Sequence, residues 1–233
     1  MTEQLATMPA IDVMRLSIVT SVPEFHPEYA AFVAFPVFGF LIHHPDGPIV
    51  IDTGIGLGNE AIDVLYGHES VRLIDEINRL GVDERDVLLV ANSHLHFDHC
   101  GQNHELSCPI AVQQTEVEAA QVPFYTVPAW AAISAERARL LDGDSELAPG
   151  VEALLTPGHT PGHQAIVIRA ADEAVVIAAQ CIFRGDEWNS GPAAANLHDP
   201  SWRGAAADSI ERLRALHPRR VLLSHASELR FTT

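Results

Sequence analysis

Residues 92–103 read NSHLHFDHCGQN and follow the apolar run DVLLVA, which has the length and composition of a buried strand. His94, His96, Asp98 and His99 therefore stand where a strand ends and a loop begins. Imidazole nitrogen and carboxylate oxygen are ligands that zinc takes in proteins. Because side chains two apart in an extended chain point to the same side, we expect His94 and His96 to face one ion together. A polar loop that gathered these residues by chance is the alternative; the rest of the chain argues against it by offering further ligands.

Two further stretches offer those ligands. Residues 155–163 read LTPGHTPGH, in which two prolines and two glycines enclose His159 in a fixed turn after a strand. We expect His159 to be the third ligand of one metal, and His163 to be structural or to support a ligand from behind. His225 follows another apolar run, VLLS. Alone it would be interpreted as a core histidine, but beside the other histidines we interpret it as a ligand.

Short apolar runs rich in Val, Ile and Phe recur along the chain and end in Gly, Pro or Asp, which predicts strands. The expected strands are residues 15–20, 37–43, 48–52, 87–92, 110–113, 150–156, 164–169, 174–179 and 220–224. The expected helices are residues 70–80, 134–141 and 205–216. Residues 122–133, with two prolines and three aromatic residues, predict a loop or a short lid-like insertion. Together these elements indicate a mixed α/β layered fold rather than a purely parallel sheet.

The composition limits the classes of partner. The 233 residues carry 14 Arg, no Lys and 31 Asp and Glu, a formal charge of −17 that argues against nucleic acid and against an anionic membrane surface. The longest uncharged apolar stretch, about residues 29–42, is interrupted by Pro36 and Gly39 and is shorter than the ~18 residues of a spanning helix. No secretory signal opens the sequence, and three cysteines make no disulfide framework, so we expect a cytoplasmic protein. The length suits one domain over residues 1–233.

With its motifs in this order, the chain resembles the metallo-β-lactamase superfamily. The shared features are HxHxDH at residues 94–99, IDTG at residues 51–54, TPGHTPGH and the late His225. Within the superfamily the chain is most similar to the N-acyl homoserine lactonase branch, with 4-pyridoxolactonase close by. The phrases that carry this similarity are FGFLIHHPDGPIVIDTG, SHLHFDHCGQN, IAVQQTEVEAA and LAPGVEALLTPGHTPGHQ. The resemblance covers about residues 15–225 and implies an α+β fold: an αββα sandwich of two mixed sheets packed face to face, with helices outside.

The resemblance also implies a set of metal ligands at the strand ends. One zinc ion would be held by His94, His96 and His159, and a second by Asp98, His99 and His225. Asp52, in the IDTG turn, would steady the ligands from behind, the alternative being a plain turn aspartate.

Three positions depart from the family pattern: Gln180, Phe183 and Ala226, the last standing where lactonases commonly have Asp. The bridging Asp of the family falls on Gln180, whose neutral amide oxygen is a weaker ligand, so the second metal should bind weakly or be absent. Asp186 or Glu187 could compensate, although neither has the family's spacing. Cys181 could ligate a soft metal, but neighbours in a strand point to opposite faces, so only one of Gln180 and Cys181 should face the site. Phe183 stands where lactonases usually carry a Tyr whose hydroxyl contacts the substrate carbonyl, so one donor is missing.

The missing donor could come from the lid-like segment, through Tyr125 or Trp130. Residues 124–130, which begin with Phe124, would form an apolar lid suited to an acyl chain or a flat ring. We therefore expect Phe183, Phe124, Tyr125 and Trp130 to line the substrate pocket.

These features predict a zinc-dependent hydrolase that opens a lactone or related ester, such as a quorum-signalling N-acyl homoserine lactone, by attack of a metal-bound hydroxide. Asp98 would orient the nucleophile and pass a proton to the leaving alkoxide. One alternative is a hydrolase of the same fold that acts on a thioester, phosphodiester, carbamate or β-lactam. Another is a catalytically impaired metal-binding homologue. The expected partner is a small-molecule substrate, with a homodimer left open.

Overall fold

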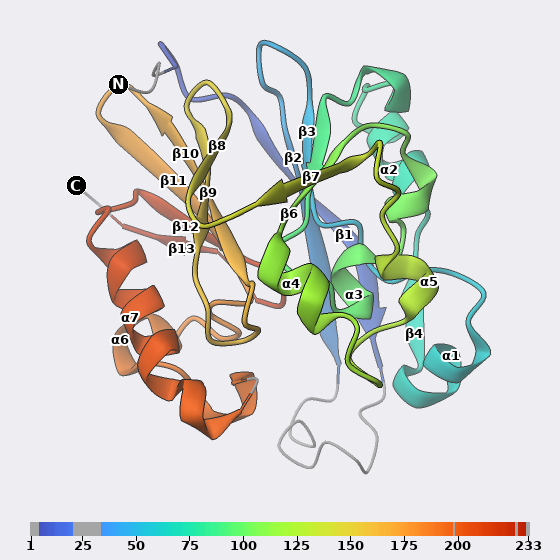
Figure 1. Cartoon of the computed structure of the whole chain (residues 1–233). Helices are drawn as coiled ribbons and strands as arrows, with labels where there is room; N and C mark the ends of the chain where they lie inside the picture. Colours follow the sequence, from blue (N-terminus) through green and yellow to red (C-terminus); the bar gives the residue numbers. More distant parts are fainter. Residues whose placement is uncertain (1–4, 21–33, 198, 227, 232–233) are drawn as a thin grey trace.

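Two packed β-sheets with helices on both outer sides make up the protein (Figure 1). The computed structural model describes residues 5–20, 34–197, 199–226 and 228–231. The αββα layering expected for an α+β fold is confirmed.

The first sheet has seven strands in the described chain, in the spatial order β4-β1-β2-β3-β5-β6-β7. Their bounds are β1 (Ile11–Val19), β2 (Phe35–Ile42), β3 (Ile49–Ile51), β4 (His68–Ser70), β5 (Leu89–Ala91), β6 (Ile110–Gln113) and β7 (Ala138–Leu141). The strands from β4 to β3 pair antiparallel, and those from β3 to β7 pair parallel. This sheet is therefore mixed, as expected.

The second sheet has six strands in the described chain, in the order β13-β12-β11-β10-β9-β8. Their bounds are β8 (Ser145–Ala148), β9 (Val151–Leu155), β10 (Gln164–Ala170), β11 (Glu173–Ala179), β12 (Arg220–Leu223) and β13 (Leu229–Arg230). Only β11 and β12 pair parallel; the other pairs are antiparallel.

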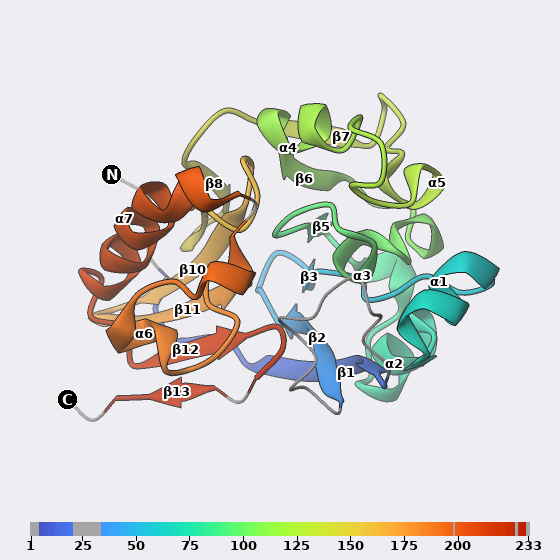
Figure 2. The same cartoon turned by 90° about the horizontal axis from the view of Figure 1, so that it is seen from below.

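Helices cover the two outer faces. They are α1 (Glu60–Tyr66), α2 (Leu73–Arg79), α3 (Phe97–Cys100), α4 (Gln114–Ala119), α5 (Pro128–Ala131), α6 (Glu187–Ser190) and α7 (Arg203–Arg214). Figure 2 shows α6 and α7 beside the second sheet, on the opposite side of the molecule from α1 and α2. The apolar face of α7 packs Ile210 and Leu213 onto the second sheet, and α2 packs Ile77 onto the first.

The main core lies between the sheets. Ile42 and Ile51 of the first sheet pack against Ile168 and Ile177 of the second, and all four side chains are fully buried. Burial of such a side chain stabilises the fold by about 1.5–3 kcal/mol. A shared core is what one domain requires, but its extent over residues 1–233 stays a prediction, since residues 1–4 and others lie outside the described residues.

The nine predicted strands are confirmed, with bounds shifted by a few residues. Two predicted helices are confirmed, over residues 73–79 and 203–214. The helix predicted over residues 134–141 is wrong, because Ala138–Leu141 forms β7 and pairs parallel with β6. The spacing suited a helix, but the open edge of β6 offers backbone hydrogen bonds along the whole segment. The predicted lid-like segment contains the short helix α5.

Five strands end at the same edge of the sandwich: β3, β5, β9, β11 and β12. In the first sheet β3 and β5 run parallel; in the second, β9, β11 and β12 share one direction. The expected site residues follow these strands directly. No helix in the described part of the chain is long and apolar enough to cross a bilayer. Residues 29–33 of the apolar stretch lie outside the described residues, and its remainder is mostly β2.

Candidate metal centre

The loop between β5 and α3 turns its side chains toward one edge of the sandwich. The backbone is extended at His96, with φ −63° and ψ 152°, and the single turn of α3 follows. Asp98 and His99 lie within that turn and are buried. The extended part thus carries His94 and His96, and the turn brings the next two candidate ligands back to the same place.

Three imidazoles converge in a first group, the three-histidine cluster of His94, His96 and His159. Nε2 of His94 and Nε2 of His159 lie 3.1 Å and 3.0 Å from Nδ1 of His96. Each ring offers one nitrogen to a common point, with these atoms all within 4.8 Å of one another. The turn after β9 therefore brings His159 to the two histidines that follow β5.

A second group, the Asp98 cluster, contains Asp98, His99 and His225, whose ligand atoms also lie within 4.8 Å of one another. Asp98 Oδ2 is 3.4 Å from Nε2 of His99 and 3.6 Å from Nε2 of His225. Gln180 joins this cluster, because its Oε1 lies 3.1 Å from each of the same two nitrogens.

Hydrogen bonds from behind fix four of the five rings. In each, Nδ1 donates to an oxygen, which leaves Nε2 directed into its cluster. The pairs are His94 with Ser93 Oγ (3.0 Å), His99 with Asp52 Oδ2 (2.8 Å), His159 with the carbonyl of Asn196 (3.1 Å) and His225 with the carbonyl of Pro36 (3.0 Å). These hydrogen bonds set the orientation of the four rings.

Asp52 supports both clusters. Its Oδ2 accepts from His99 Nδ1 and from the Ser93 hydroxyl (2.7 Å), and its Oδ1 accepts from the Ser93 backbone N–H (2.7 Å). Since Ser93 in turn accepts from His94, one carboxylate reaches a ring of each cluster. Asp52 has a left-handed backbone, φ 59°, and is fully buried, which is more specific than an ordinary turn aspartate.

Two glycines let this loop approach the segment after β3. A Cβ at Gly101 would lie 2.0 Å from the backbone nitrogen of Gly56, and the Gly101 N–H donates to the carbonyl of Gly54 (2.9 Å). A Cβ at Gly56 would lie 2.4 Å from the ring of Trp130. The backbone around α3 is therefore packed against its neighbours with no room for a side chain.

The charge states of the clusters differ. Burial, followed by the charges of neighbouring histidines, lowers the pKa of His94 and of His159 well below the usual value. These rings are neutral at pH 7, as metal ligation requires. Burial alone would also lower the pKa of His99, but the carboxylates of Asp98 and Asp52 outweigh it and raise that pKa to about 10.

The other two members of the Asp98 cluster are also shifted. Burial would raise the pKa of Asp98, but the charge of His99 and its hydrogen bond outweigh burial and lower it. Burial lowers the pKa of His225 to about 4. Without a metal, the cluster therefore pairs an ionised carboxylate with a protonated His99.

The donor sets fit a divalent metal. Imidazole nitrogens make up one cluster, and imidazole, carboxylate and amide oxygen make up the other. All of these side chains are buried except His96, which is half-buried. Imidazole and carboxylate together are typical of zinc and similar cations rather than of calcium.

The alternatives for the bridging position lie elsewhere. Asp186 is paired with Arg184 at the surface, and the buried carboxylate of Glu187 accepts from the backbone N–H groups of Arg184 and Ala193. Cys181 packs into the core between the second sheet and α7, whereas Gln180 faces the cluster. The two side chains face different surroundings, as expected, but the reason differs: β11 ends at Ala179, and both residues lie in a turn in which the Cys181 N–H donates to the carbonyl of Ala178.

The expected pocket residues divide into two pairs. The ring of Phe183 lies 4.9 Å from that of His225, and the ring of Tyr125 lies 4.7 Å from that of His96. Trp130 is buried in the core beside α3, and Phe124 is fully exposed with a left-handed φ of 67°. The structure thus brings Phe183 and Tyr125 to the clusters. Trp130 lies away from them in the core, and Phe124 lies away from them at the surface.

His163 lies behind the three-histidine cluster, with its ring 5.5 Å from that of His94. Its Nδ1 bonds the hydroxyl of Thr156 (2.8 Å), while its buried Nε2 has no partner among the described residues. Burial lowers the pKa of His163 to about 3, so the ring is neutral. It belongs to neither ligand group, as expected of a supporting residue.

Sequence reasoning missed three residues that hold the site: Ser93, Glu116 and Asn196. Asn196 accepts from His159 through its carbonyl and donates its side-chain amide to the carbonyl of Gln180 (3.0 Å). Ser93 and Glu116 stand inside stretches already quoted for their family likeness, which was the available signal. Nothing in the sequence around Asn196 indicated its role.

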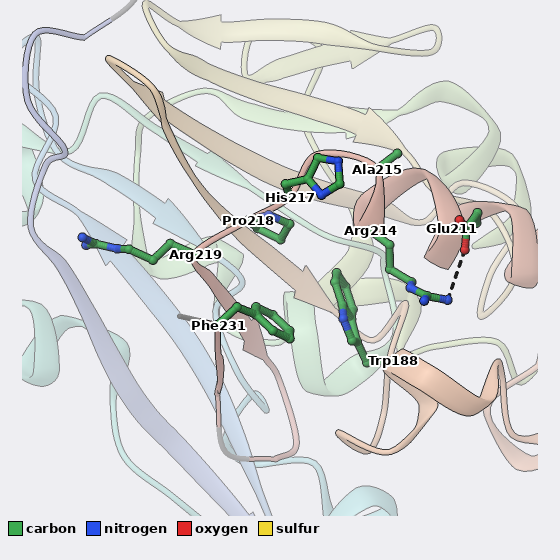
Figure 3. Close-up of a pocket in the computed structure, with 8 residues that line it drawn as sticks. All are labelled: Trp188, Glu211, Arg214, Ala215, His217, Pro218, Arg219 and Phe231. Carbon is green, nitrogen blue, oxygen red and sulfur yellow. Dashed lines mark hydrogen bonds and ion pairs between the residues drawn. The ribbon is translucent and has the colours of Figure 1, made fainter. Parts of the chain in front are cut away.

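A hollow of about 510 Å³ lies away from both clusters, beside α7 and the C-terminal strand (Figure 3). Trp188 and Phe231 lie on it with ring centroids 5.5 Å apart. Its arginines are paired with acids, Arg214 with Glu211 and Arg219 with Glu173. None of the residues that line it belongs to either cluster.

Comparison with known proteins agrees with this geometry. An N-acyl homoserine lactonase of Bacillus sp is 35% identical over 155 residues, which span 61% of this chain and 62% of that relative's length. A solved quorum-quenching N-acyl homoserine lactone lactonase superposes with a TM-score of 0.77 at 26% identity, covering 97% of this chain and 94% of that one. An N-acyl homoserine lactone hydrolase, solved with the product N-hexanoyl-L-homoserine bound at its catalytic metal centre, gives 0.76 at 26% identity, with coverages of 97% and 94%.

The resemblance drawn from the sequence is confirmed, including its direction toward the lactonase branch. The superfamily match runs over residues 33–225, which contain both clusters and every strand of the described chain except β1 and β13. The chain belongs to the metallo-beta-lactamase superfamily.

Proposed function

We propose that this protein is a zinc-dependent hydrolase that opens the ring of a lactone, with N-acyl homoserine lactones as the substrate class. The observation that carries the proposal is the pair of adjacent clusters at one edge of the sandwich, which together offer five imidazoles and one carboxylate. The names of the relatives give the substrate class, and the bound N-hexanoyl-L-homoserine of one solved relative indicates the kind of product.

The proposed ligands of one ion are His94, His96 and His159, and those of the second are Asp98, His99 and His225. Gln180 Oε1 would contribute a neutral ligand beside the second ion. A zinc ion supplies Lewis acidity toward a carbonyl oxygen and makes a nearby water acidic enough to attack at neutral pH. The second ion would bind with lower affinity than the first, because Gln180 brings no negative charge to balance the charge of the ion.

Asp98 is the proposed catalytic acid–base. Its carboxylate is ionised and buried, and one oxygen faces two imidazoles at 3.4 Å and 3.6 Å. In this position it can orient the attacking water, accept its proton and return that proton to the leaving alkoxide as the ring opens. Such a residue contributes typically 10²–10⁴-fold to a rate.

The substrate would lie against the aromatic rings beside the clusters. Phe183 packs against His225 and against Phe35, whose ring centroid is 5.7 Å away, so this side of the site is apolar. Tyr125 covers His96 on the other side, and its hydroxyl donates to Glu116. An acyl chain suits the apolar side. The phenol that lactonases carry at the position of Phe183 is replaced by a ring without a donor.

That replacement favours one alternative, a hydrolase of the same fold with another ester-like substrate, such as a thioester, carbamate, phosphodiester or β-lactam. A catalytically impaired metal-binding protein is the remaining alternative. The cytoplasmic location and a homodimer also stay predictions.

The test is hydrolysis of a panel of N-acyl homoserine lactones by protein reloaded with zinc, with acid release as the measurement and metal content determined on the same sample. We expect ring opening that stops when a chelator removes the zinc. Metal-dependent hydrolysis of another class in the panel, with lactones untouched, would favour the alternative substrate. Metal binding with no hydrolysis would favour the impaired homologue, and failure to bind metal would end the proposal.

A further inference from the structure

Glu116, in the first turn of α4, is fully buried and accepts four hydrogen bonds. Its Oε1 accepts from the backbone N–H of Leu95 (2.9 Å) and from the hydroxyl of Tyr125. Its Oε2 accepts from the hydroxyl of Thr160 (2.8 Å) and from the backbone N–H of Gly162 (3.1 Å). Three of these donors, on Leu95, Thr160 and Gly162, come from segments distant from α4 in the chain. The fourth, on Tyr125, comes from the loop that follows α4.

These donors belong to the segments that carry the three-histidine cluster. Leu95 stands between His94 and His96, and Thr160 is the neighbour of His159. The ring of Tyr125 packs at a tilt against the ring of His96, with a centroid distance of 4.7 Å. One carboxylate therefore joins the loop after β5, the turn after β9 and the loop before α5.

The spacing around the carboxylate is tight. A Cβ at Gly162 would lie 2.4 Å from the backbone nitrogen of Glu116, so the turn after β9 rests directly on the start of α4. Within the described residues, no arginine bonds this carboxylate. A buried carboxylate without a cation is costly, and an apolar side chain would fill the space more cheaply if filling were all that mattered.

We propose that Glu116 is a positioning residue, which sets the separation of His94, His96 and His159 and couples the Tyr125 loop to them. It acts through backbone and hydroxyl donors and belongs to neither ligand group. The N–H of Leu95 fixes the extended backbone that turns His94 and His96 to the same side, and the bonds from Thr160 and Gly162 hold His159 opposite them. This inference rests on the proposed function, in that the cluster must hold a metal.

The test is Glu116→Gln, which conserves size. Each carboxylate oxygen accepts from one backbone N–H, and a backbone N–H cannot reverse its role, so the amide NH₂ of Gln opposes a donor in either orientation. We expect the affinity of the three-histidine cluster for zinc, measured by competition with a chelating dye, to fall about 10–100-fold. The visible absorption of the Co²⁺-loaded protein should change as well, because the ligand geometry shifts.

Glu118→Gln is the matched control. Glu118 lies on the same helix, is exposed and bonds Gln114. It undergoes the same chemical change and should leave affinity and spectrum as in the unaltered protein. Tyr125→Phe removes one of the four donors and covers the case in which Glu116→Gln does not fold. For it we expect a shifted Co²⁺ spectrum and a loss of zinc affinity below tenfold.

A merely structural role gives a different pattern. If Glu116→Gln and Tyr125→Phe lower the thermal stability of the metal-free protein but leave zinc affinity and the Co²⁺ spectrum unchanged, the inference is overturned. If the unaltered protein itself binds no zinc or Co²⁺, the proposed function fails instead, so the two failures are distinguishable.

Discussion

The two clusters lie side by side but are prepared for a metal in different ways. The three-histidine cluster contains imidazoles alone, and two of its rings, His94 and His159, have their pKa lowered by burial and by neighbouring histidines. The Asp98 cluster contains an ionised carboxylate and a His99 whose pKa is raised to about 10. A metal can enter the first cluster without displacing a proton from those two rings, whereas it must displace one from the second. The difference teaches that a similar number of ligand atoms does not make two equivalent sites.

The largest effect is expected when the Asp98 cluster loses its charge. Asp98→Asn keeps the shape of the side chain but removes the proton acceptor, so kcat should fall about 10²–10⁴-fold with the fold intact by circular dichroism. Metal analysis should still find one zinc per chain, in the three-histidine cluster. Asp208→Asn, an exposed change on α7, serves as the control. A rate within twofold of the unaltered protein would remove Asp98 from the mechanism.

A smaller loss is expected from Asp52→Asn, which touches both clusters. In either orientation the amide NH₂ opposes a donor, Nδ1 of His99 or the backbone N–H of Ser93. The support of the His99 ring is therefore weakened directly, and that of the His94 ring through Ser93. Zinc affinity should fall about 10–100-fold, more at the Asp98 cluster than at the other. Calorimetric titration resolves the two sites, and exposed Asp46→Asn is the control. Equal losses at both sites would contradict the direct contact to His99 as the main anchor.

A gain is expected from Gln180→Asp. At about 4 Å and an effective dielectric near 20, a pair of unit charges attracts by about 4 kcal/mol, and desolvation cancels much of that. A tenfold rise in affinity needs about 1.4 kcal/mol, so we expect the second metal to bind about tenfold more tightly or better. Sequential zinc titration measures it, with the three-histidine cluster as internal reference. An unchanged second affinity would mean that the neutral amide is not what limits this site.

The smallest signal is a count of protons. Below pH 10 the ring of His99 is protonated in the metal-free protein, since its pKa is raised to about 10, so zinc at the Asp98 cluster should release about one proton from it at pH 8. His94 and His159 are already neutral and should release none. Calorimetry in buffers of different ionisation enthalpy gives both numbers. Equal proton release by the two metals would remove the contrast between the clusters.

The sequence located the candidate ligands because each follows a strand whose apolar run is easily seen. His94, His159 and His225 stand after runs that the structure forms as β5, β9 and β12, and parallel directions bring these ends together. Their role as ligands stays a prediction. The supporting residues were harder to find, because Glu116 and Asn196 act through hydrogen bonds between segments distant in the chain. Composition and spacing carry no signal for such contacts.

The segment between α4 and β7 shows a second limit. Phe124, Tyr125 and Trp130 are all large aromatic residues, yet their surroundings differ. Phe124 is exposed, Tyr125 packs against His96, and Trp130 lies in the core. Which aromatic side chain faces the site depends on backbone turns, such as the left-handed φ of Phe124, that local sequence does not specify. The neighbouring residues 134–141 were predicted as a helix for a related reason, since their strand exists only through pairing with β6.

The close backbone contact between Gly56 and Gly101 has a consequence for directed evolution. A side chain at Gly101 would displace both the turn that carries Asp98 and His99 and the chain after the IDTG motif. Libraries that randomise residues around the site should therefore hold both glycines constant and place their diversity at Phe183 and Phe35. The aromatic residues beside the clusters can therefore vary during selection for new substrates. The contact between Gly56 and Gly101 cannot be changed by a single substitution.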